Sequence, residues 1–257
     1  MQNTGLLNED KIISFLNKTP YYKLPKNWQN MVQIMFGAES VTFINKLRKV
    51  KACKPINKYI KPDIILQFAG SEKTISIKTG KASNLHTENL ETFMKFLLSL
   101  GVSKRTIQTI LLVHYGDGTL NGTGKVRYDF NQVYCAYRKR ILEANVELNA
   151  STEVIKKVLD RVIFYGVDEK SRKADFLYFG DEEDGTLISE RQIKKYIDRK
   201  PGNWDFFENV HIGPIVLRPH ARYAHKDIVS EKRRNEIQCN WPNLQGDMQY
   251  IEKRYGY

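Results

Sequence analysis

The chain has 257 residues and a formal net charge of +12, with 41% apolar and 27% charged residues. This composition is that of a folded protein and excludes an intrinsically disordered chain. Apolar runs such as 96–100 and 110–113 are far too short to span a bilayer, and the first residues lack a secretory signal. Three widely separated cysteines argue against a disulfide framework or a CxxC zinc site, so we expect a soluble, cytoplasmic protein.

The positive charge is concentrated in the first part of the chain. Residues 1–110 hold 17 Lys and Arg against 7 Asp and Glu, whereas residues 111–257 hold 24 against 22. Between Glu39 and Asp63 the basic residues occur without a single acid; they are Lys46, Arg48, Lys49, Lys51, Lys54, Lys58 and Lys61. Such a field attracts polyanions, which makes nucleic acid the leading candidate partner. A solvated Lys-rich face is the alternative interpretation.

The first half of the sequence predicts helices on both sides of a strand pair. In chain order, we expect a helix over 8–17, a helix or broken helix pair over 28–51, strands over 63–68 and 73–78, a helix from 87 or 89 to 100, and a helix over 103–114. The turn between the two strands is expected at 69–72.

The second half mixes helices and strands more loosely. It predicts a Gly-rich loop over 115–125, helices over 128–149 and 152–164, a strand pair over 174–179 and 186–189, a helix over 189–199, and strands over 214–217 and 236–241. We therefore expect an α/β (α+β) fold with a central mixed β-sheet flanked by helices, rather than a doubly wound parallel sheet. Without an internal repeat or low-complexity tract, a single domain over 1–257 is expected.

Polar residues gather at one end of the first strand pair. Asp63 begins one strand, and Ser76 and Lys78 end the next, projecting from the same face because they are two residues apart. Glu88 and Glu91 follow where a helix is expected to begin. Hydrolysis of a phosphodiester needs carboxylates to hold Mg²⁺ and a lysine to position the attacking water and offset charge. The pattern therefore indicates a metal-dependent phosphodiesterase site.

Each of these residues also has a simpler interpretation. Aspartate is common at the start of a strand and lysine at its end, so Asp63 and Lys78 could be ordinary residues of these positions. Glu88 and Glu91 would favourably oppose the macrodipole at the start of a helix. It is the combination of these residues at this spacing that favours the catalytic hypothesis.

Pro62-Asp63 followed by Ser76-Ile77-Lys78 resembles the signature of the PD-(D/E)xK, or restriction-endonuclease-like, nucleases. The resemblance covers about Glu39 to Leu100, and Ser76 stands where an acid is usual, as in the S-x-K variant of some type II restriction endonucleases. It implies a catalytic set of Asp63, Ser76, Lys78 and Glu88 or Glu91, and a Mg²⁺ site drawn from Asp63, the Ile77 carbonyl, Glu88 or Glu91, and the upstream helix acid Glu39.

Other basic residues are candidates for DNA contacts. His86 lies just before the acidic helix, and Lys125 and Arg127 follow the Gly-rich loop, which is not a Walker A sequence because Val126 follows the lysine. The remaining candidates are Lys81, Arg218, Arg222, Arg233 and Arg234. Arginine reads guanine and contacts phosphates, so we expect 1–110 to form the catalytic core and 111–257 to supply DNA recognition, dimerisation or both.

The function expected from the sequence is a Mg²⁺-dependent endonuclease of double-stranded DNA, most simply a sequence-specific type II restriction enzyme acting as a homodimer. Two alternatives stay open at this point. One is a basic nucleic-acid-binding protein without catalysis. The other is a structure-specific repair or resolvase nuclease.

Overall fold

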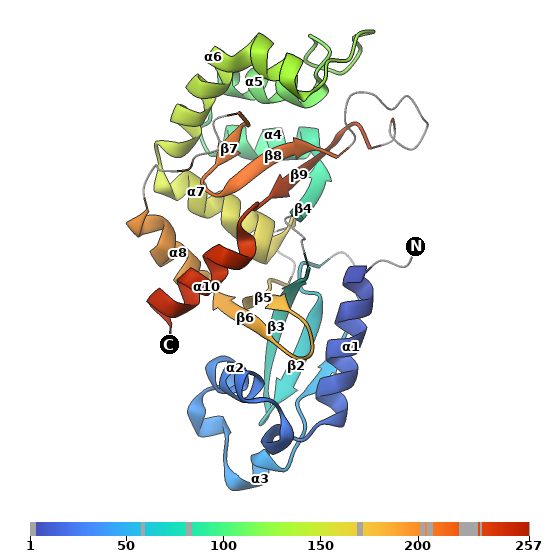
Figure 1. The fold of residues 1–257 in the computed structure, drawn as a ribbon, viewed down its shortest axis with the longest axis vertical. Coiled ribbons are helices and arrows are strands. Elements are labelled where there is room, and N and C mark those ends of the chain that lie inside the picture. Colours follow the sequence, from blue (N-terminus) through green and yellow to red (C-terminus); the bar gives the residue numbers. More distant parts are fainter. Residues whose placement is uncertain are drawn as a thin grey trace. The chain divides into compact units, whose positions relative to one another are not determined.

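The computed structural model describes residues 4–57, 60–80, 84–168, 172–200, 204, 208–220, 231 and 233–256 (Figure 1). The chain forms two compact units, one of residues 1–82, 160–196 and 244–257, and the other of residues 83–159 and 197–243. One mixed sheet and one antiparallel sheet are flanked by helices, which confirms the expected fold class. The sequence-based division at residue 110 does not coincide with these units, because 160–196 and 244–257 return to the first unit.

The first unit is built on a five-stranded sheet in the order β1-β2-β3-β5-β6. Only β3 and β5 pair in parallel, and the other neighbours are antiparallel. The strands are β1 (Lys51–Cys53), β2 (Ile64–Phe68), β3 (Ser71–Lys78), β5 (Phe176–Gly180) and β6 (Gly185–Ser189). The predicted strands 63–68 and 73–78 are thus confirmed. Their turn is tighter than expected, because Ala69 and Gly70 both take positive φ, of 51° and 82°.

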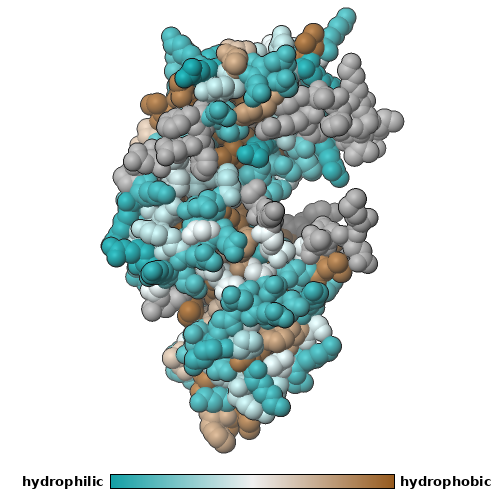
Figure 2. All heavy atoms as spheres, in the orientation of Figure 1, coloured by the Kyte–Doolittle hydropathy of each residue, from teal (hydrophilic) through white to brown (hydrophobic). Residues whose placement is uncertain are grey.

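Several helices belong to the first unit. They are α1 (Thr4–Lys18), η1 (Tyr21–Lys23), α2 (Lys26–Phe36), η2 (Ala38–Ser40), α3 (Phe43–Lys46), the π-helical η3 (Asp160–Tyr165) and α10 (Leu244–Tyr255), while α8 (Glu190–Arg199) begins there. Of the two alternatives expected over 28–51, the structure has the broken helix, since Gly37 has φ 86° and ends α2. Apolar atoms are exposed over α3, at the lower end of Figure 2.

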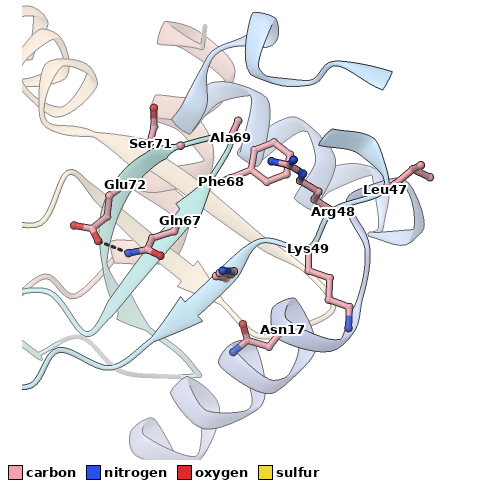
Figure 3. Close-up of a pocket in the computed structure, with 11 residues that line it drawn as sticks. Asn17, Leu47, Arg48, Lys49, Gln67, Phe68, Ala69, Ser71 and Glu72 are labelled. Atoms are coloured by element: carbon pink, nitrogen blue, oxygen red, sulfur yellow. Dashed lines mark hydrogen bonds between the residues drawn. The ribbon is translucent and has the colours of Figure 1, made fainter. Parts of the chain in front are cut away.

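A groove with a volume of about 820 Å³ lies beside the β2–β3 turn. Its walls come from the end of α1, from the segment joining α3 to β1, and from the β2–β3 hairpin (Figure 3). This groove is at the turn end of the hairpin, whereas Asp63 and Lys78 are at the opposite end.

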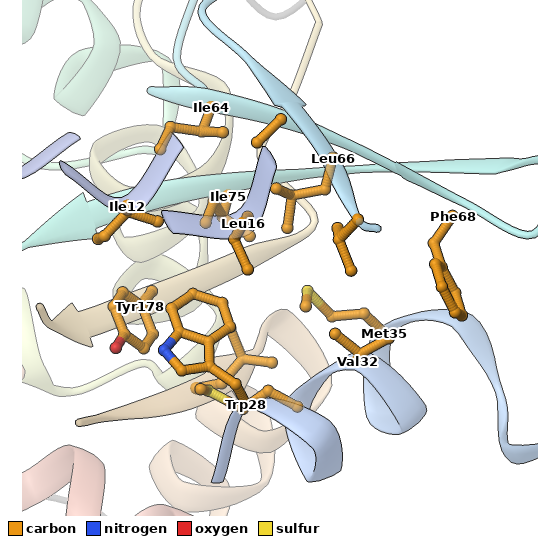
Figure 4. Packing of buried hydrophobic residues seen from close by; sticks show 14 of the residues in the cluster. Ile12, Leu16, Trp28, Val32, Met35, Ile64, Leu66, Phe68, Ile75 and Tyr178 are labelled. Carbon is orange, nitrogen blue, oxygen red and sulfur yellow. The ribbon is translucent and has the colours of Figure 1, made fainter. Parts of the chain in front are cut away.

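The core of the first unit lies between the sheet and helices α1 and α2 (Figure 4). Ile12 and Leu16 of α1 and Trp28 of α2 are almost completely buried, and Ile64 and Ile75 face them from β2 and β3. Burying side chains of this size contributes about 1.5–3 kcal/mol each. The packing fixes α1 across the sheet and so determines where its polar residues lie.

The second unit contains an antiparallel sheet in the order β4-β9-β8-β7. The strands are β4 (Asn84–Asn89), β7 (His211–Ile212), β8 (Ile215–Pro219) and β9 (Glu236–Asn240), and the helices are α4 (Leu90–Ser99), α5 (Lys104–Tyr115), α6 (Phe130–Asn149) and α7 (Thr152–Leu159). Asn89 caps α4 as expected, since its side chain accepts from the Thr92 N–H at 3.1 Å. No helix in the described ranges is long and apolar enough to cross a bilayer.

Candidate active site

The carboxylate of Asp63 is fixed against β3. One of its oxygens, Oδ2, accepts hydrogen bonds from the Ser76 hydroxyl at 3.0 Å and from the Ile77 N–H at 2.6 Å. The Asp63 N–H donates to the Ile75 carbonyl at 2.9 Å, which continues the β2–β3 ladder by one residue. None of the described residues of this unit donates a hydrogen bond to the second oxygen, Oδ1. Ser76 therefore orients the carboxylate while leaving one oxygen available for a ligand.

The backbone of Ile77 faces the same place. Ile75 and Ile77 both bond to Asp63, so the N–H and C=O groups of these alternate residues point to the β2 edge of β3. Strand β2 begins at Ile64, opposite Ile75, so it does not extend alongside Ile77. The Ile77 carbonyl consequently points to the edge where the Asp63 carboxylate lies.

Lys78 ends β3 and is half-buried. Among the described residues it forms no ion pair, although its charge acts on Glu9. A lysine held at a strand end without an ion-pair partner can donate to a phosphoryl oxygen or to a water molecule.

Glu9 of α1 is a further acid on which the charges of this region act, and the sequence did not single it out. Burial raises the pKa of this carboxyl, the negative charge of Asp63 raises it further, and the charges of Lys54 and Lys78 partly offset both effects. Its side chain is 15% exposed, and Lys54 Nζ lies 3.5 Å from Glu9 Oε2 and 2.8 Å from Asp10 Oδ1. Glu9, Asp63 and Lys78 thus share one electrostatic environment within the first unit.

Glu39 occupies a different setting from the one expected. It lies in the short 3-10 helix η2 after α2, it is exposed, and its carboxylate folds back over Gly37. Among the described residues no contact joins it to Asp63 or Lys78. Glu9, in contrast, is influenced by the charges of both Asp63 and Lys78.

Glu88 and Glu91 belong to the second unit and differ in their surroundings. Contrary to expectation, Glu88 lies on strand β4, where it is buried and its Oε1 is 3.4 Å from His86 Nε2. Glu91 is in the first turn of α4 and exposed, and its hydrogen bond with Lys95, at 2.6 Å, lowers the pKa of its carboxyl. The assignment of one of them as a metal ligand stays a prediction.

A purely structural explanation of Asp63 also has support. Asp175, just before β5, accepts from the Thr74 N–H at 2.9 Å and from the Thr74 hydroxyl at 3.0 Å. This is the pattern of Asp63, because in both cases a carboxylate preceding a strand binds an N–H and a hydroxyl of β3. Asp175 has no counterpart of Lys78 or Glu9 among its described contacts, so its hydrogen bonds indicate a structural role.

The donor set fits a hard cation. Asp63 Oδ1 and the Ile77 carbonyl are oxygen donors at the same strand edge, which is the donor type that Mg²⁺ requires, and Glu9 is an acid on which the charge of Asp63 acts. No cluster of three or more His, Cys, Asp or Glu side chains placed to hold a metal is found in the described parts of the chain. Mg²⁺ usually keeps several water ligands and is held by one or two carboxylates, so a larger cluster is not needed.

The predicted DNA-binding residues fall into distinct groups. Lys81 and Arg222 lie outside the described residues. Lys125 and Arg233 are exposed, whereas Arg127 is mostly buried and pairs with Glu231. Arg218 lies on β8 opposite Gln238 of β9, and His86 lies beside Glu88. Lys125 and Arg233 are thus the most accessible of the described candidates.

Arg234 holds the Gly-rich loop in place. Its Nη2 bonds to Asp117 Oδ2 at 2.7 Å, and the Asp117 side chain is fully buried. Asp117 also accepts from the Thr119 N–H at 2.9 Å and from the Gly124 N–H at 3.0 Å. Burial by itself raises the pKa of Asp117, but the hydrogen bonds and the charge of Arg234 outweigh it and lower the pKa. A stabilising role for Arg234 is therefore established by its contacts, and its contact with DNA stays a prediction.

Replacing Asp117 by asparagine should lower the free energy of unfolding by about 3 kcal/mol, because Arg234 would lose its buried counter-ion. The folded-state pKa of Asp117 lies below its ordinary value of 3.8, so its contribution is present above that pH and is lost as pH falls through the lowered pKa. The difference between the wild type and Asp117→Asn should consequently shrink at acid pH. Urea melts at pH 7 and at pH 3 measure it.

The matched control for this experiment is Asp129→Asn. Asp129 is an exposed cap of α6, and asparagine caps helices about as well as aspartate. This control should lose less than about 0.5 kcal/mol. Equal losses in both variants would contradict the importance of the buried pair.

No protein-family model matches the chain, and no curated protein matches it.

Proposed function

We propose that this protein is a Mg²⁺-dependent DNA endonuclease of the restriction-endonuclease-like type. The observation that carries the proposal is the Asp63 carboxylate, which Ser76 and the Ile77 N–H hold at the end of β2–β3 where Lys78 also lies. The charges of Asp63 and Lys78 also act on Glu9 of α1. Within the resemblance to PD-(D/E)xK nucleases, the finer hypothesis is a type II restriction enzyme of the cytoplasm that acts as a homodimer on double-stranded DNA.

In this proposal each residue of the site has a separate role. Asp63 and Glu9 would hold Mg²⁺ with the Ile77 carbonyl, and the resemblance adds Glu88 or Glu91. Mg²⁺ supplies Lewis acidity, polarising the phosphoryl oxygen and lowering the pKa of water. Ser76 keeps Asp63 in one orientation through its 3.0 Å hydrogen bond. Lys78 would orient the attacking water and offset the charge that develops on the phosphoryl oxygens.

The experiment that tests this proposal is incubation of the purified protein with supercoiled plasmid, in Mg²⁺ and in EDTA. We expect discrete linear fragments in Mg²⁺ and intact plasmid in EDTA, because hydrolysis requires the metal. A smear would indicate an endonuclease without sequence preference. Preferred cleavage of a branched duplex would indicate a structure-specific nuclease.

A second candidate is a DNA-binding protein without catalysis. The likeness between the Asp63 and Asp175 hydrogen bonds favours it, because a structural carboxylate needs no metal. It predicts binding that weakens steeply with salt, with no product in Mg²⁺.

A further inference from the structure

Helix α3 and the segment after it expose apolar and basic side chains together. We define the α3 patch as Phe43, Ile44, Lys46, Leu47, Arg48 and Lys49. The side chains of Phe43, Ile44 and Leu47 are 82%, 64% and 62% exposed, so they are not part of the core of the unit. Figure 2 shows apolar atoms gathered over α3, where these residues lie. A contiguous exposed apolar patch rimmed by charge marks an interaction surface.

The patch is held in a defined conformation. The Thr42 hydroxyl caps α3 by accepting from the Asn45 N–H at 3.2 Å, and the Asn45 side chain donates to the Ser40 carbonyl at 2.8 Å. The Arg48 carbonyl accepts from the Tyr21 N–H at 2.8 Å, and Lys49 forms a bridge with Pro20. The exposed side chains therefore project from an anchored backbone, and binding would cost little ordering of the main chain.

The 820 Å³ groove adjoins the patch directly. Leu47, Arg48 and Lys49 belong to both, and Lys51 adds a third cation to the groove lining. Figure 3 shows the side chains of Leu47, Arg48 and Lys49 on one side of the groove and those of Gln67 and Glu72 on another.

The acid in this groove is already engaged. Glu72 bonds to Gln67 Nε2 at 2.8 Å and pairs with Arg172. In contrast, none of the described acids pairs with Lys46, Arg48, Lys49 or Lys51. The groove therefore presents uncompensated positive charge.

The charge of the patch decides which partner fits. A second copy of the chain meeting this patch across a two-fold axis would oppose Lys46, Arg48 and Lys49 to like charges, which is costly. A lipid surface needs a longer amphipathic face than the single turn of α3. A nucleic-acid duplex satisfies both features, because its phosphates bind cations and its grooves accept apolar side chains against sugars and base steps.

We propose that the α3 patch is a duplex-DNA docking surface at the turn end of the β2–β3 hairpin, separate from the candidate active site. Arg48, Lys49 and Lys51 contact phosphates along the groove, and Phe43, Ile44 and Leu47 press into the adjoining DNA groove. The inference rests on the proposed function, since it assigns a second contact surface for the same substrate.

Binding of a fluorescent duplex, measured by anisotropy in EDTA across a salt series, tests this inference. Arg48→Ala/Lys49→Ala should weaken binding about tenfold or more at low salt and reduce the slope of log K against log salt by about 2, one per lost phosphate contact. Phe43→Ser/Ile44→Ser should weaken binding at every salt concentration while keeping the slope, because it removes no charge. Thermal melts check that all variants are folded.

Matched controls are Lys26→Ala, an exposed lysine at the start of α2, and Val146→Ser, an apolar residue of α6 that is 74% exposed. Both should bind within about twofold of the wild type, since neither lies in the patch. Wild-type affinity and slope in both patch variants would overturn the inference. So would a loss of binding to phosphatidylserine vesicles, or a loss of dimerisation in sedimentation, with duplex binding unchanged.

Because binding is measured in EDTA, this test separates the two proposals. If the patch variants weaken duplex binding and the wild type does not cleave in Mg²⁺, the proposed catalysis would be contradicted and the docking surface supported. If both patch variants instead cleave the plasmid in Mg²⁺ at the wild-type rate, the proposed catalysis would be supported and the docking surface contradicted.

Discussion

Asp63→Asn should abolish Mg²⁺-dependent cleavage, by about a hundredfold to a thousandfold, while leaving duplex binding intact. The asparagine can still accept the hydrogen bonds from Ser76 and Ile77, so the end of β2 should stay in place. What it cannot do is offer a charged oxygen to a cation at the Oδ1 position. The measurement is the rate of plasmid cleavage at saturating Mg²⁺, with anisotropy in EDTA as the binding assay.

Asp175→Asn is the matched control, because Asp175 makes the same two types of hydrogen bond to Thr74 of β3. Each variant should lose about 1 kcal/mol of stability, since each weakens similar hydrogen bonds. Only Asp63→Asn should lose cleavage. If both variants cleave at the wild-type rate, Asp63 is a structural residue only.

Lys78→Ala is the companion test of the same site. Lys78 forms no ion pair among the described residues, so its loss should change stability little while removing the group that would orient water. Normal cleavage by this variant would show that the site has been assigned wrongly.

Local patterns predicted much of the first unit correctly. The strand expected over 73–78 lies within β3, and the spacing of Pro62-Asp63 and Ser76-Ile77-Lys78 brought together residues that do lie at one end of a hairpin. Both patterns depend on neighbours in sequence joined by a tight turn. The register of such a hairpin follows from its length, so sequence reasoning could reach it.

Other elements depend on partners distant in sequence. Strand β4, NLHTEN, is polar and has little strand propensity, and it forms because it pairs with β9, about 150 residues later. The sequence therefore predicted a loop and a helix start there, which put Glu88 on the wrong element. The short strand β1 was likewise taken for the end of a helix, and α10 and β7 were missed.

Glu9 was missed for a similar reason. In NED, at the start of an amphipathic helix, it reads as a solvated first-turn acid, and only the packing of α1 across the sheet lets the charge of Asp63 act on it. One signal was available. Glu9 precedes Ile12 and Leu16 by three and seven residues, so it lies on the same helix stripe as two core residues. An acid on a buried stripe needs a partner, and Lys54 is the partner of this one, with Nζ 3.5 Å from Glu9 Oε2. The charge of Lys78 also favours the ionised form of Glu9, whereas that of Asp63 opposes it.

Glu9→Gln should therefore reduce cleavage about a hundredfold and raise the Mg²⁺ concentration needed for half-maximal rate, because glutamine removes a charged oxygen ligand. Glutamine keeps the volume of the side chain, so α1 should stay packed through Ile12 and Leu16. Glu39→Gln is the matched control and should cleave at close to the wild-type rate, since its carboxylate is exposed over Gly37. The measurement is a Mg²⁺ titration of the initial cleavage rate.

The same titration ranks the remaining acids. A change in the Mg²⁺ requirement in Glu88→Gln would identify the buried β4 acid as a further ligand, and a change in Glu91→Gln would select the exposed acid that pairs with Lys95. If Glu39→Gln loses cleavage and Glu9→Gln cleaves at the wild-type rate, the electrostatic link between Glu9, Asp63 and Lys78 does not serve metal binding. In that case Glu9 is a partly buried acid whose ion pair with Lys54 serves the packing of α1 alone.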